Sequence, residues 1–395
     1  MKIGLPYLYP GKISGQGVFE ETFAQGLKAK GVEIDRMYPT NKELRKIEKV
    51  GTVLTMASLR EHLDRVNNCD LLYSTNGTAI TFLDDKTKIP VVPAYHSTGL
   101  TIWLRLVKNV ETMPEYDLFK KYEKELESIE LVPLDVSEGS LEFWGRCGRY
   151  MAREAKHIVA VSENVKQELI DFGEVDPNKI KVIENGIEKA WFKKEYECSE
   201  CNKITSKWPD KPTVMWIGRM GRERNSFKTK GIDRLLEVMD KLDGKKIYKV
   251  VVAIVPDEKP GQLEKYKRLF TKRGIDFYPN WPYEHLPHIM IQGDIFLMTS
   301  RYEGFSLSII EAMACGMVPI TYSIGVVPQA IQDKKNGLVV KNVDEMVEKV
   351  IWLTNNEEKQ IEMAEAAKNT SKKRYQLDTM LDRYIGYYQN IISKK

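Results

Sequence analysis

The sequence predicts an α/β protein made of two doubly wound, Rossmann-like domains that face a cleft. Strand-like apolar runs alternate with helix-like runs along the chain, and after a polar stretch at 193–211 the alternation starts again. Strands that alternate with helices form parallel sheets with helices on both faces. A chain of 395 residues is long enough for two or three domains. We expect domains at 1–185 and 186–370, and a C-terminal helix at 371–395.

The first series begins with the strand-like run "KIGLPYLY" at 2–9 and the helix-like run "VFEETFAQGLKAKG" at 18–31. A long helical region is expected from about Thr101 to Ala155, and Ser162 is a candidate cap for the helix "ENVKQELIDFG". The remaining expected strands of this half are "VEIDRMY" at 32–38, "DLLYSTNG" at 70–77, "IPVVPAYH" at 89–96, "HIVAVS" at 157–162 and "KIKVIENGI" at 179–187.

The second series follows the same pattern. Its expected strands are "TVMWIGRM" at 213–220, "YKVVVAIV" at 248–255, "DIFLMTS" at 294–300, "VPITY" at 318–322 and "GLVV" at 337–340. Its expected helices are "GIDRLLEVMDKL" at 231–242, "GQLEKYKRLFTKRG" at 261–274, "LSIIEAMACG" at 307–316 and "VDEMVEKVIWLTN" at 343–355. The last segment, "LDTMLDRYIGYYQNII" at 377–392, is an amphipathic helix whose Tyr and Ile stripe needs a surface to pack on.

Composition excludes several classes of protein. Hydrophobic residues make up 42% and charged residues 29%, which is typical of a soluble globular protein. The formal charge of +4 is too small to indicate a nucleic-acid partner. No signal peptide pattern and no apolar run of membrane-spanning length is found. The five cysteines are few and irregularly spaced, so we expect a reducing, cytoplasmic location.

No metal site is expected from the sequence. Cys198 and Cys201 form a C-x-x-C, but a structural zinc needs four ligands and no second cysteine pair follows. We therefore predict free thiols there. The histidines show no spacing typical of a metal site, and no cofactor is expected.

The stretch "RYEGFSLSIIEAMACG" at 301–316 carries two glutamates, Glu303 and Glu311. Ser308 and Glu311 fit a capping box, in which serine and glutamate satisfy backbone donors at a helix start. Glu303 is not explained by capping. It follows an expected strand, and ligands bind at the carboxyl ends of strands in open α/β sheets. Two carboxylates at a helix start could bind a ligand that carries hydroxyls and phosphate.

Cations and glycines lie at other strand ends. Arg219 ends one expected strand and Lys230 begins the next helix, a placement that suits a diphosphate, with Lys228 as the alternative lysine. The turn "SGQG" at 14–17 either approaches a phosphate or is only a tight turn. His96 ends another expected strand and either meets a sugar hydroxyl or is structural.

Together these motifs resemble the family-4 retaining glycosyltransferases of the GT-B fold. The resemblance rests on "SGQGVFEETFAQGLKAKGVEI", "HIVAVSENVKQELI", "VIENGIE", "WIGRM…KGIDRLLEVM" and above all "EGFSLSIIEAMACGMVPI", which looks like the family's E-x7-E signature. It implies that Glu311 holds the nucleotide ribose and that Glu303 contacts the donor sugar. It also implies that the C-terminal helix crosses back to the first domain.

The resemblance implies further donor contacts. Arg219 and Lys230 would hold the diphosphate, and His96 would touch the sugar. The residues whose backbone would cradle or close over the donor are Gly15, Gln16 and Gly17 in the first domain and Gly304, Phe305, Ser306 and Leu307 in the second.

The implied activity is retaining transfer of a sugar from a nucleotide sugar, with a UDP-sugar as the first expectation and no metal. The acceptor would be a glycan, a glycoconjugate or a lipid-linked molecule. The stretch "GLTIWLRLVKN" at 99–109 is expected on the acceptor side or at a membrane surface, with a buried helix as the alternative. Two other functions stay open: a GT-B-fold nucleotide-sugar epimerase, and a non-catalytic nucleotide-sugar-binding partner of a transferase.

Overall fold

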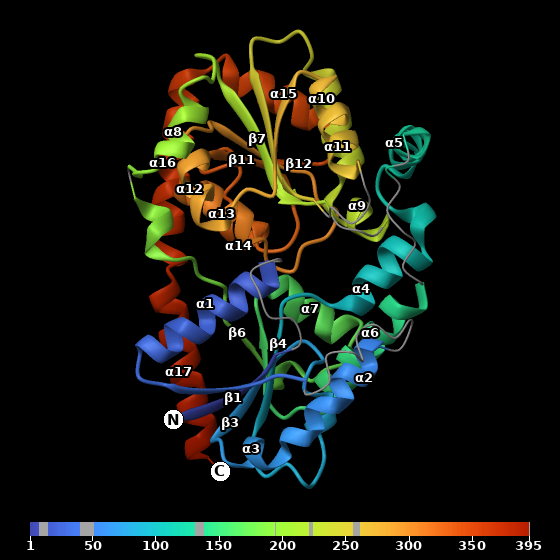
Figure 1. The fold of residues 1–395 in the computed structure, drawn as a ribbon, viewed down its shortest axis with the longest axis vertical. Coiled ribbons are helices and arrows are strands. Elements are labelled where there is room, and N and C mark those ends of the chain that lie inside the picture. Colours follow the sequence, from blue (N-terminus) through green and yellow to red (C-terminus); the bar gives the residue numbers. More distant parts are fainter. Residues whose placement is uncertain are drawn as a thin grey trace. The chain divides into compact units, whose positions relative to one another are not determined.

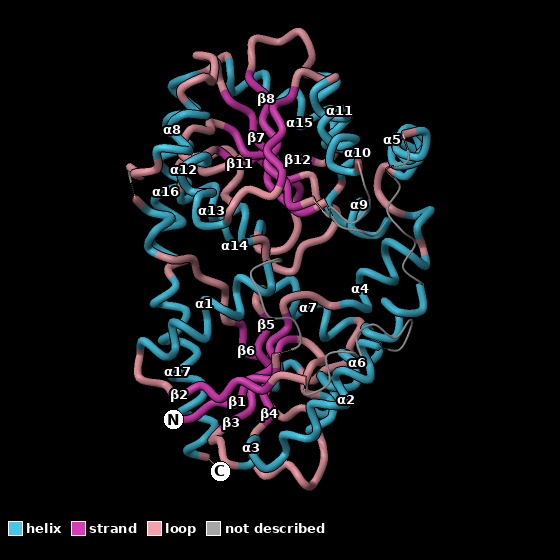
Figure 2. Tube along the Cα trace, in the orientation of Figure 1, coloured by secondary structure: helices cyan, strands magenta, loops and turns pink. Residues whose placement is uncertain are grey.

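The computed structural model describes residues 1–7, 15–39, 51–129, 131, 138–193, 195–220, 224–255 and 261–394. The chain divides into two compact units. Unit 1 comprises Met1–Leu104, Ser137–Gly186 and Leu377–Lys395, and unit 2 comprises Arg105–Val136 and Ile187–Gln376. Each unit holds one parallel sheet, so the predicted α/β class with two doubly wound domains is confirmed (Figures 1 and 2).

Unit 1 contains a sheet of six strands within the described residues, in the order β2-β1-β3-β4-β5-β6. The strands are β1 (Lys2–Pro6), β2 (Glu33–Met37), β3 (Leu71–Thr75), β4 (Val91–Tyr95), β5 (Ile158–Ala160) and β6 (Ile180–Val182). The helices are α1 (Gly15–Ala29), α2 (Gly51–Ser58), α3 (Leu63–Asn67), α4 (Gly99–Trp103), α6 (Glu138–Glu154), α7 (Glu163–Asp171) and α17 (Leu377–Ser393). Short helical turns are η2 (Leu59–His62), η3 (Ile80–Phe82) and η6 (Pro177–Lys179).

The predicted cap and the predicted crossing helix both occur in unit 1. The hydroxyl of Ser162 accepts a hydrogen bond of 3.2 Å from the backbone N–H of Val165 at the start of α7. The C-terminal helix α17 packs on α1, where the rings of Phe23 and Tyr384 lie 4.8 Å apart. Tyr384 and Tyr388 are fully buried, so the Tyr and Ile stripe of α17 is part of the core of unit 1.

Unit 2 contains a second sheet, also of six strands within the described residues, in the order β12-β11-β10-β7-β8-β9. The strands are β7 (Thr213–Arg219), β8 (Tyr248–Ile254), β9 (Ile275–Pro279), β10 (Ile295–Met298), β11 (Val318–Tyr322) and β12 (Leu338–Val340). The helices are α5 (Tyr116–Ser128), α8 (Ser199–Thr205), α9 (Arg224–Lys230), α10 (Ile232–Lys241), α11 (Gln262–Thr271), α12 (Leu286–Met290), α13 (Leu307–Ala314), α14 (Val327–Ala330), α15 (Val343–Thr354) and α16 (Glu357–Arg374). Short turns are η5 (Val110–Thr112), η7 (Lys189–Phe192) and η8 (Tyr283–His285), and the π-helical turn η4 (Leu104–Lys108) lies at the boundary of the units.

The predicted helical region from about Thr101 to Ala155 is not one continuous helix. The described part of this region breaks into α4, η4, η5, α5 and α6. Pro114 explains one break, because the residue before a proline is held out of the helical conformation, and Met113 is extended there. Glu115 follows with a left-handed φ of 59° before α5 begins.

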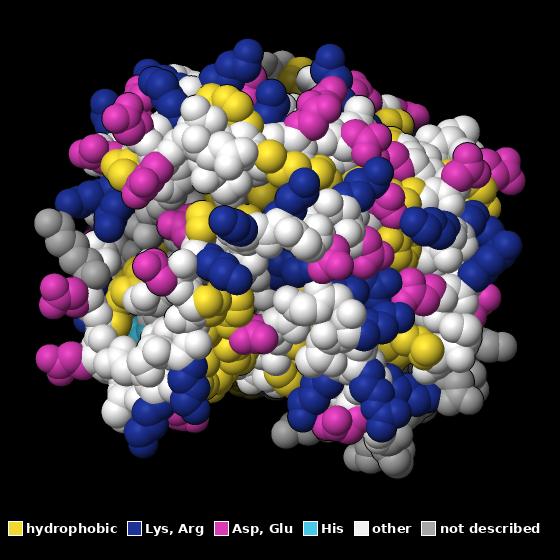
Figure 3. All heavy atoms as spheres, turned by 90° about the horizontal axis from the view of Figure 1, so that it is seen from above, with side chains coloured by type: hydrophobic (Ala, Val, Ile, Leu, Met, Phe, Trp, Pro, Cys, Tyr) yellow, Lys and Arg dark blue, Asp and Glu magenta, His cyan; other side chains and the backbone are white. Residues whose placement is uncertain are grey.

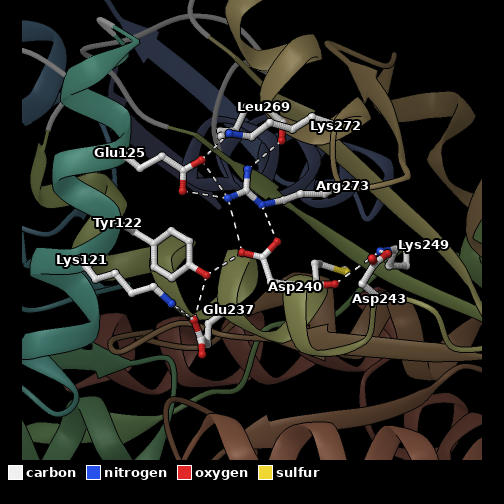
Figure 4. Close-up of polar contacts among 11 residues, drawn as sticks. Lys121, Tyr122, Glu125, Glu237, Asp240, Asp243, Lys249, Leu269, Lys272 and Arg273 are labelled. Carbon is white, nitrogen blue, oxygen red and sulfur yellow. Dashed lines mark hydrogen bonds and ion pairs between the residues drawn. The ribbon is translucent and has the colours of Figure 1, made fainter.

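Helix α5 packs on α10, although the predicted boundary assigns it to the first domain. Figure 4 shows its polar contacts, in which the guanidinium of Arg273 bonds both oxygens of Glu125 at 2.8 Å. The hydroxyl of Tyr122 donates to Asp240 at 2.7 Å and to Glu237 at 2.8 Å. The apolar face of α5 joins the core of unit 2, so the segment after η4 belongs with the second sheet.

Two further observations concern the surface. No helix among the described residues is long and apolar enough to cross a membrane. Basic and acidic side chains are interspersed over the face that Figure 3 shows, without a field of one sign.

Candidate functional site

The order of the second sheet fixes where its ligand site should be. Strand β7 lies between β8 and β10, so the chain continues to one side of β7 first and to the other side later. Open α/β sheets bind ligands at this switch point, outside the carboxyl ends of the two strands. Arg219 is the last residue of β7, and Glu303 lies five residues beyond the end of β10.

The structure brings Glu303 and Lys230 together at this edge. The Nζ of Lys230 donates to Oε1 of Glu303 at 2.7 Å, and the hydroxyl of Ser300 donates to the same oxygen at 2.8 Å. Both charged side chains keep some exposure, 30% for Lys230 and 13% for Glu303. The pair is therefore accessible to a ligand that could exchange with either partner.

A glycine lets Lys230 reach this position. Gly231 has a φ of +60°, and a Cβ there would lie 2.1 Å from the carbonyl oxygen of Thr299. A side chain is excluded by both the conformation and the contact. The hydroxyl of Thr299 also donates to the carbonyl of Lys230 at 2.9 Å, so the end of α9 is fixed against the end of β10.

The two candidate lysines differ in their surroundings. Lys228 is buried and donates to the carbonyl of Leu106 at 3.3 Å, with its Nζ 5.5 Å from the centre of the Phe119 ring. Lys230 instead meets Glu303 at the strand edge. Arg219, at the end of β7, is exposed. Lys228 thus anchors the segment around η4 and α5, and Lys230 remains the candidate for a diphosphate.

The predicted capping box at Ser308 and Glu311 is wrong. Helix α13 already begins at Leu307, its cap residue Ser306 has a left-handed φ of 81°, and no side chain caps it. The hydroxyl of Ser308 lies 3.2 Å from that of Ser306 instead. Glu311 is consequently in the second turn of α13, where its carboxylate is free of a capping role and points elsewhere.

Glu311 points to Tyr283. The hydroxyl of Tyr283 donates to Oε1 of Glu311 at 2.7 Å, and Glu311 is 4% exposed. Burial raises the pKa of Glu311 to about 7, which the Tyr283 hydrogen bond partly offsets and the charge of Glu188 reinforces. A buried carboxyl of this kind can accept hydrogen bonds from ligand hydroxyls.

The loop between the two glutamates is held in place. Gly325, with a φ of +56°, lies so close that a Cβ would be 2.8 Å from the Phe305 carbonyl, and the backbone N–H of Val326 donates to that carbonyl at 3.0 Å. Gly304 to Ser306 therefore lead into α13 along a fixed path. Their placement before a helix N-terminus suits the backbone contacts to phosphate that the sequence predicts.

Sequence reasoning missed Ser300 and Tyr283. Tyr283 lies 28 residues before Glu311, in η8, and its ring packs edge-on against Trp191 at 5.7 Å. The aromatic run "NWPYEHLP" carries no motif that would single out Tyr283. Ser300 ends the run "LMTS", and its hydrogen bond to Glu303 is seen only in the folded structure.

Unit 1 holds the other predicted residues. Gly15 and Gln16 begin α1 and Gly17 follows, while Ser14 lies outside the described residues. His96 lies directly after β4, its ring centre 4.3 Å from that of Phe19 on α1. Burial lowers the pKa of His96 to about 3, so its imidazole is neutral at physiological pH. The glycine turn and His96 thus lie near the same end of α1.

The stretch at 99–109 is only partly available as a surface. Leu106 and Val107 are buried, and Trp103 and Leu104 are half-buried. Helix α4 packs closely on α6, where a Cβ at Gly145 would lie 2.7 Å from the backbone of Leu100. The apolar side chains at 106 and 107 therefore pack within the protein.

Comparisons with known proteins identify the family of the chain. Residues 13–191 match the family model described as Glycosyltransferase Family 4, and residues 205–370 match that described as Glycosyl transferases group 1. Trehalose synthase of Pyrococcus horikoshii is 25% identical over 279 residues, which cover 68% of this chain and 65% of that protein. The match thus spans slightly less than two thirds of that relative.

Solved structures show the same fold. Sucrose-phosphate synthase from Thermosynechococcus elongatus aligns over 100% of both chains with a TM-score of 0.76 at 14% identity. Anabaena Alr3699/HepE in complex with UDP-glucose aligns over 99% of this chain and 100% of that one, with a TM-score of 0.69 at 14% identity. Since the two family models together span most of the sequence, the chain belongs to the family-4 glycosyltransferases of the GT-B fold.

Proposed function

We propose that the protein is a retaining glycosyltransferase that moves a sugar from a nucleotide sugar to an acceptor. The observation that carries the proposal is the pair of carboxylates at the switch point of the second sheet. Glu303 is paired with Lys230, and Glu311 is buried against Tyr283. A UDP-sugar is the first donor to test, which the structures of Anabaena Alr3699/HepE with UDP and UDP-glucose support.

Each donor group has an assigned partner in unit 2. Glu311 accepts hydrogen bonds from the ribose hydroxyls, and Glu303 contacts the hydroxyls of the sugar. Arg219 and Lys230 bind the diphosphate, Arg as a fork and Lys as a point charge. The backbone of Gly304, Phe305, Ser306 and Leu307 cradles the sugar and phosphate at the start of α13.

In unit 1, we assign the glycine turn and His96 to contacts with the donor. Glycines at 15 and 17 allow the backbone to approach a phosphate closely. The neutral imidazole of His96 can exchange a hydrogen bond with a sugar hydroxyl without adding a charge.

The reaction breaks the bond between the anomeric carbon and the β-phosphate oxygen and forms a bond to an acceptor hydroxyl oxygen. Negative charge builds on the departing diphosphate, and Arg219 and Lys230 stabilise it. The leaving phosphate accepts the acceptor proton on the same face of the sugar, which retains the anomeric configuration. No metal is assigned to this step.

The acceptor is proposed to be a glycan, a glycoconjugate or a lipid-linked molecule, and the enzyme to act in the cytoplasm. The sparse, irregular cysteines support a reducing location. A lipid-linked acceptor would bring the enzyme to a membrane surface, and co-sedimentation with anionic vesicles in the presence and absence of acceptor lipid tests that association.

A donor screen tests the proposal. The purified chain is heated with UDP-, GDP-, ADP- and dTDP-sugars, and the expected result is a raised melting temperature with one nucleotide class. The stabilising donor is then incubated with and without acceptor pools, and the product anomer is assigned by NMR. Retained configuration with acceptor-dependent turnover is expected.

Other outcomes would contradict the proposal. Conversion of the donor to its epimer without acceptor would identify an epimerase. Donor binding without turnover in any acceptor pool would identify a non-catalytic partner. Glu303→Gln should lose turnover, whereas Glu348→Gln, an exposed carboxylate on α15, is the matched control and should keep it.

A further inference from the structure

Four metal-ligating side chains converge in unit 2. Cys198 caps α8 and Cys201 lies in its first turn, while His285 ends η8 and His288 lies in α12. One ligand atom from each residue lies within 4.8 Å of all the others. The sequence shows no second ligand pair near the C-x-x-C, because the two histidines are 87 residues away. We propose that these four residues form a structural Cys2His2 zinc site.

Both sulfur–nitrogen separations suit tetrahedral zinc, whereas the two sulfurs are bonded to each other. The Sγ of Cys198 lies 3.7 Å from Nδ1 of His285, and the Sγ of Cys201 lies 3.2 Å from Nδ1 of His288. Zn–S bonds of about 2.3 Å and Zn–N bonds of about 2.0–2.1 Å place tetrahedral ligand atoms roughly 3.3–3.8 Å apart. Cellular thiols would first reduce the Cys198–Cys201 bond with two electrons and let the two sulfurs move apart. Two thiolates and two imidazoles would then fill the coordination shell of one ion.

The surroundings support closed coordination. The backbone N–H of Cys201 donates to the Sγ of Cys198 at 3.2 Å, which holds this sulfur at the start of α8. Cys201 is 2% exposed, and the Tyr196 ring lies over His288 with ring centres 4.7 Å apart. With four protein ligands and an aromatic cover, the ion would have no open position, which is typical of structural zinc.

The structure pairs Cys198 with Cys201 as a disulfide, so the predicted free thiols are wrong, because the start of α8 brings the two sulfurs together. This disulfide is the rival state to a zinc site. The histidines favour the metal. A disulfide needs no nearby imidazole nitrogens, whereas a zinc ion coordinates all four ligand atoms. The free cysteines of the described residues, Cys69, Cys147 and Cys315, have no comparable partners.

The position of the site indicates which segments the metal would hold together. It ties the segment before β7 to the segment that carries η8 and α12, and helices α8 and α12 pack on each other. Tyr283, the hydrogen-bond partner of Glu311, lies two residues before His285. Trp191, which packs on Tyr283, lies seven residues before Cys198. Zinc would therefore hold Tyr283 and Trp191 in place beside Glu311. This consequence, unlike the site itself, rests on the proposed function.

The full chain is tested for zinc after purification without chelator and with any affinity tag removed. We expect one zinc per chain by plasma mass spectrometry, and a loss of at least about tenfold in Cys201→Ser and in His288→Asn. The matched controls Cys147→Ser and His157→Asn, which change the same residue types in unit 1, should keep full occupancy. A thiol-blocking mercurial should release the zinc as it bonds the sulfurs of Cys198 and Cys201.

Two results would overturn the site. A metal-free protein whose denatured chain titrates three thiols of its five would show a disulfide. A metal-free protein that titrates all five and takes up no added Zn²⁺ would show that the cluster is not a metal site.

The second readout is UDP affinity by calorimetry. Weaker binding in His288→Asn but not in His157→Asn would support the role of zinc beside Glu311. A zinc-loaded wild type that binds no nucleotide would overturn the proposed function and leave the metal site standing.

Discussion

Glu303 and Glu311 follow the same strand and lie eight residues apart, yet their surroundings differ. Glu303 shares a partly exposed edge with Lys230 and Ser300. Glu311 is buried and accepts a hydrogen bond from the hydroxyl of Tyr283. An ion pair that keeps some exposure can exchange a partner for a ligand, whereas a buried carboxyl costs stability unless something hydrogen-bonds it. The difference predicts that Glu303 serves the reacting sugar and that Glu311 serves binding.

The largest loss of rate is expected when Lys230, the partner of Glu303, is replaced. Lys230→Ala removes a cation from the leaving diphosphate, and loss of one such group lowers the rate by about 10²–10³. The variant should fold normally, because the ion pair is partly exposed. Initial rates with saturating acceptor measure the change.

Lys245→Ala, an exposed lysine beyond α10, is the control for Lys230→Ala and should keep the wild-type rate. Equal rates for Lys230→Ala and wild type would remove Lys230 from the site. A loss with Lys228→Ala alone would transfer the role to the buried lysine.

Glu311→Gln should weaken nucleotide binding by roughly 10- to 150-fold, since a hydrogen bond to a charged acceptor is worth about 1.5–3 kcal/mol. Calorimetry with the free nucleotide measures this without any acceptor. Glu303→Gln should change the same constant much less, because Glu303 is assigned to the sugar. If the two variants weaken free nucleotide equally, the division of roles between the glutamates is wrong.

The same substitution should change how stability depends on pH. The pKa of Glu311 is about 7 in the folded chain, above the ordinary value of 4.5 for a glutamate. The folded chain therefore binds this proton more tightly, and the free energy of unfolding falls as pH rises from about 4.5 through 7. The full effect is on the order of 3 kcal/mol.

Melting temperatures of wild type and Glu311→Gln at about pH 5 and about pH 8 measure this effect. The fall between the two values should be smaller in Glu311→Gln. Glu348→Gln supplies the matched control, and parallel pH curves for wild type and Glu311→Gln would contradict the raised pKa.

The sequence predicted what depends on order along the chain. Alternating strands and helices gave two parallel sheets, and strand ends placed Glu303 and Arg219 at the switch point of the second sheet. Lys230 reaches Glu303 because the residues after β7 and β10 meet at that edge. Such contacts follow from topology, which periodicity reveals.

Contacts between distant segments could not be predicted from one sequence. Nothing in the sequence links Glu125 to Arg273, and only the fold places the two side chains together. Tyr283 and the two histidines lie in a short irregular stretch without periodicity. The capping box failed for a local reason, since Ser306 adopts a left-handed conformation and α13 starts before Ser308.

The smallest effect is expected from brief chelation. The charge on the leaving diphosphate is assigned to Arg219 and Lys230, so turnover should persist within about twofold after short exposure to EDTA. Zinc bound by Cys198, Cys201, His285 and His288 would be released slowly from a closed site, and its content is measured in the same sample. Immediate loss of turnover that Mg²⁺ or Mn²⁺ restores would place a metal at the diphosphate. A slow loss of turnover that parallels zinc release, and that Zn²⁺ but not Mg²⁺ restores, would indicate that zinc acts by holding Tyr283 and Trp191 beside Glu311. In that case nucleotide binding should weaken before the rate falls.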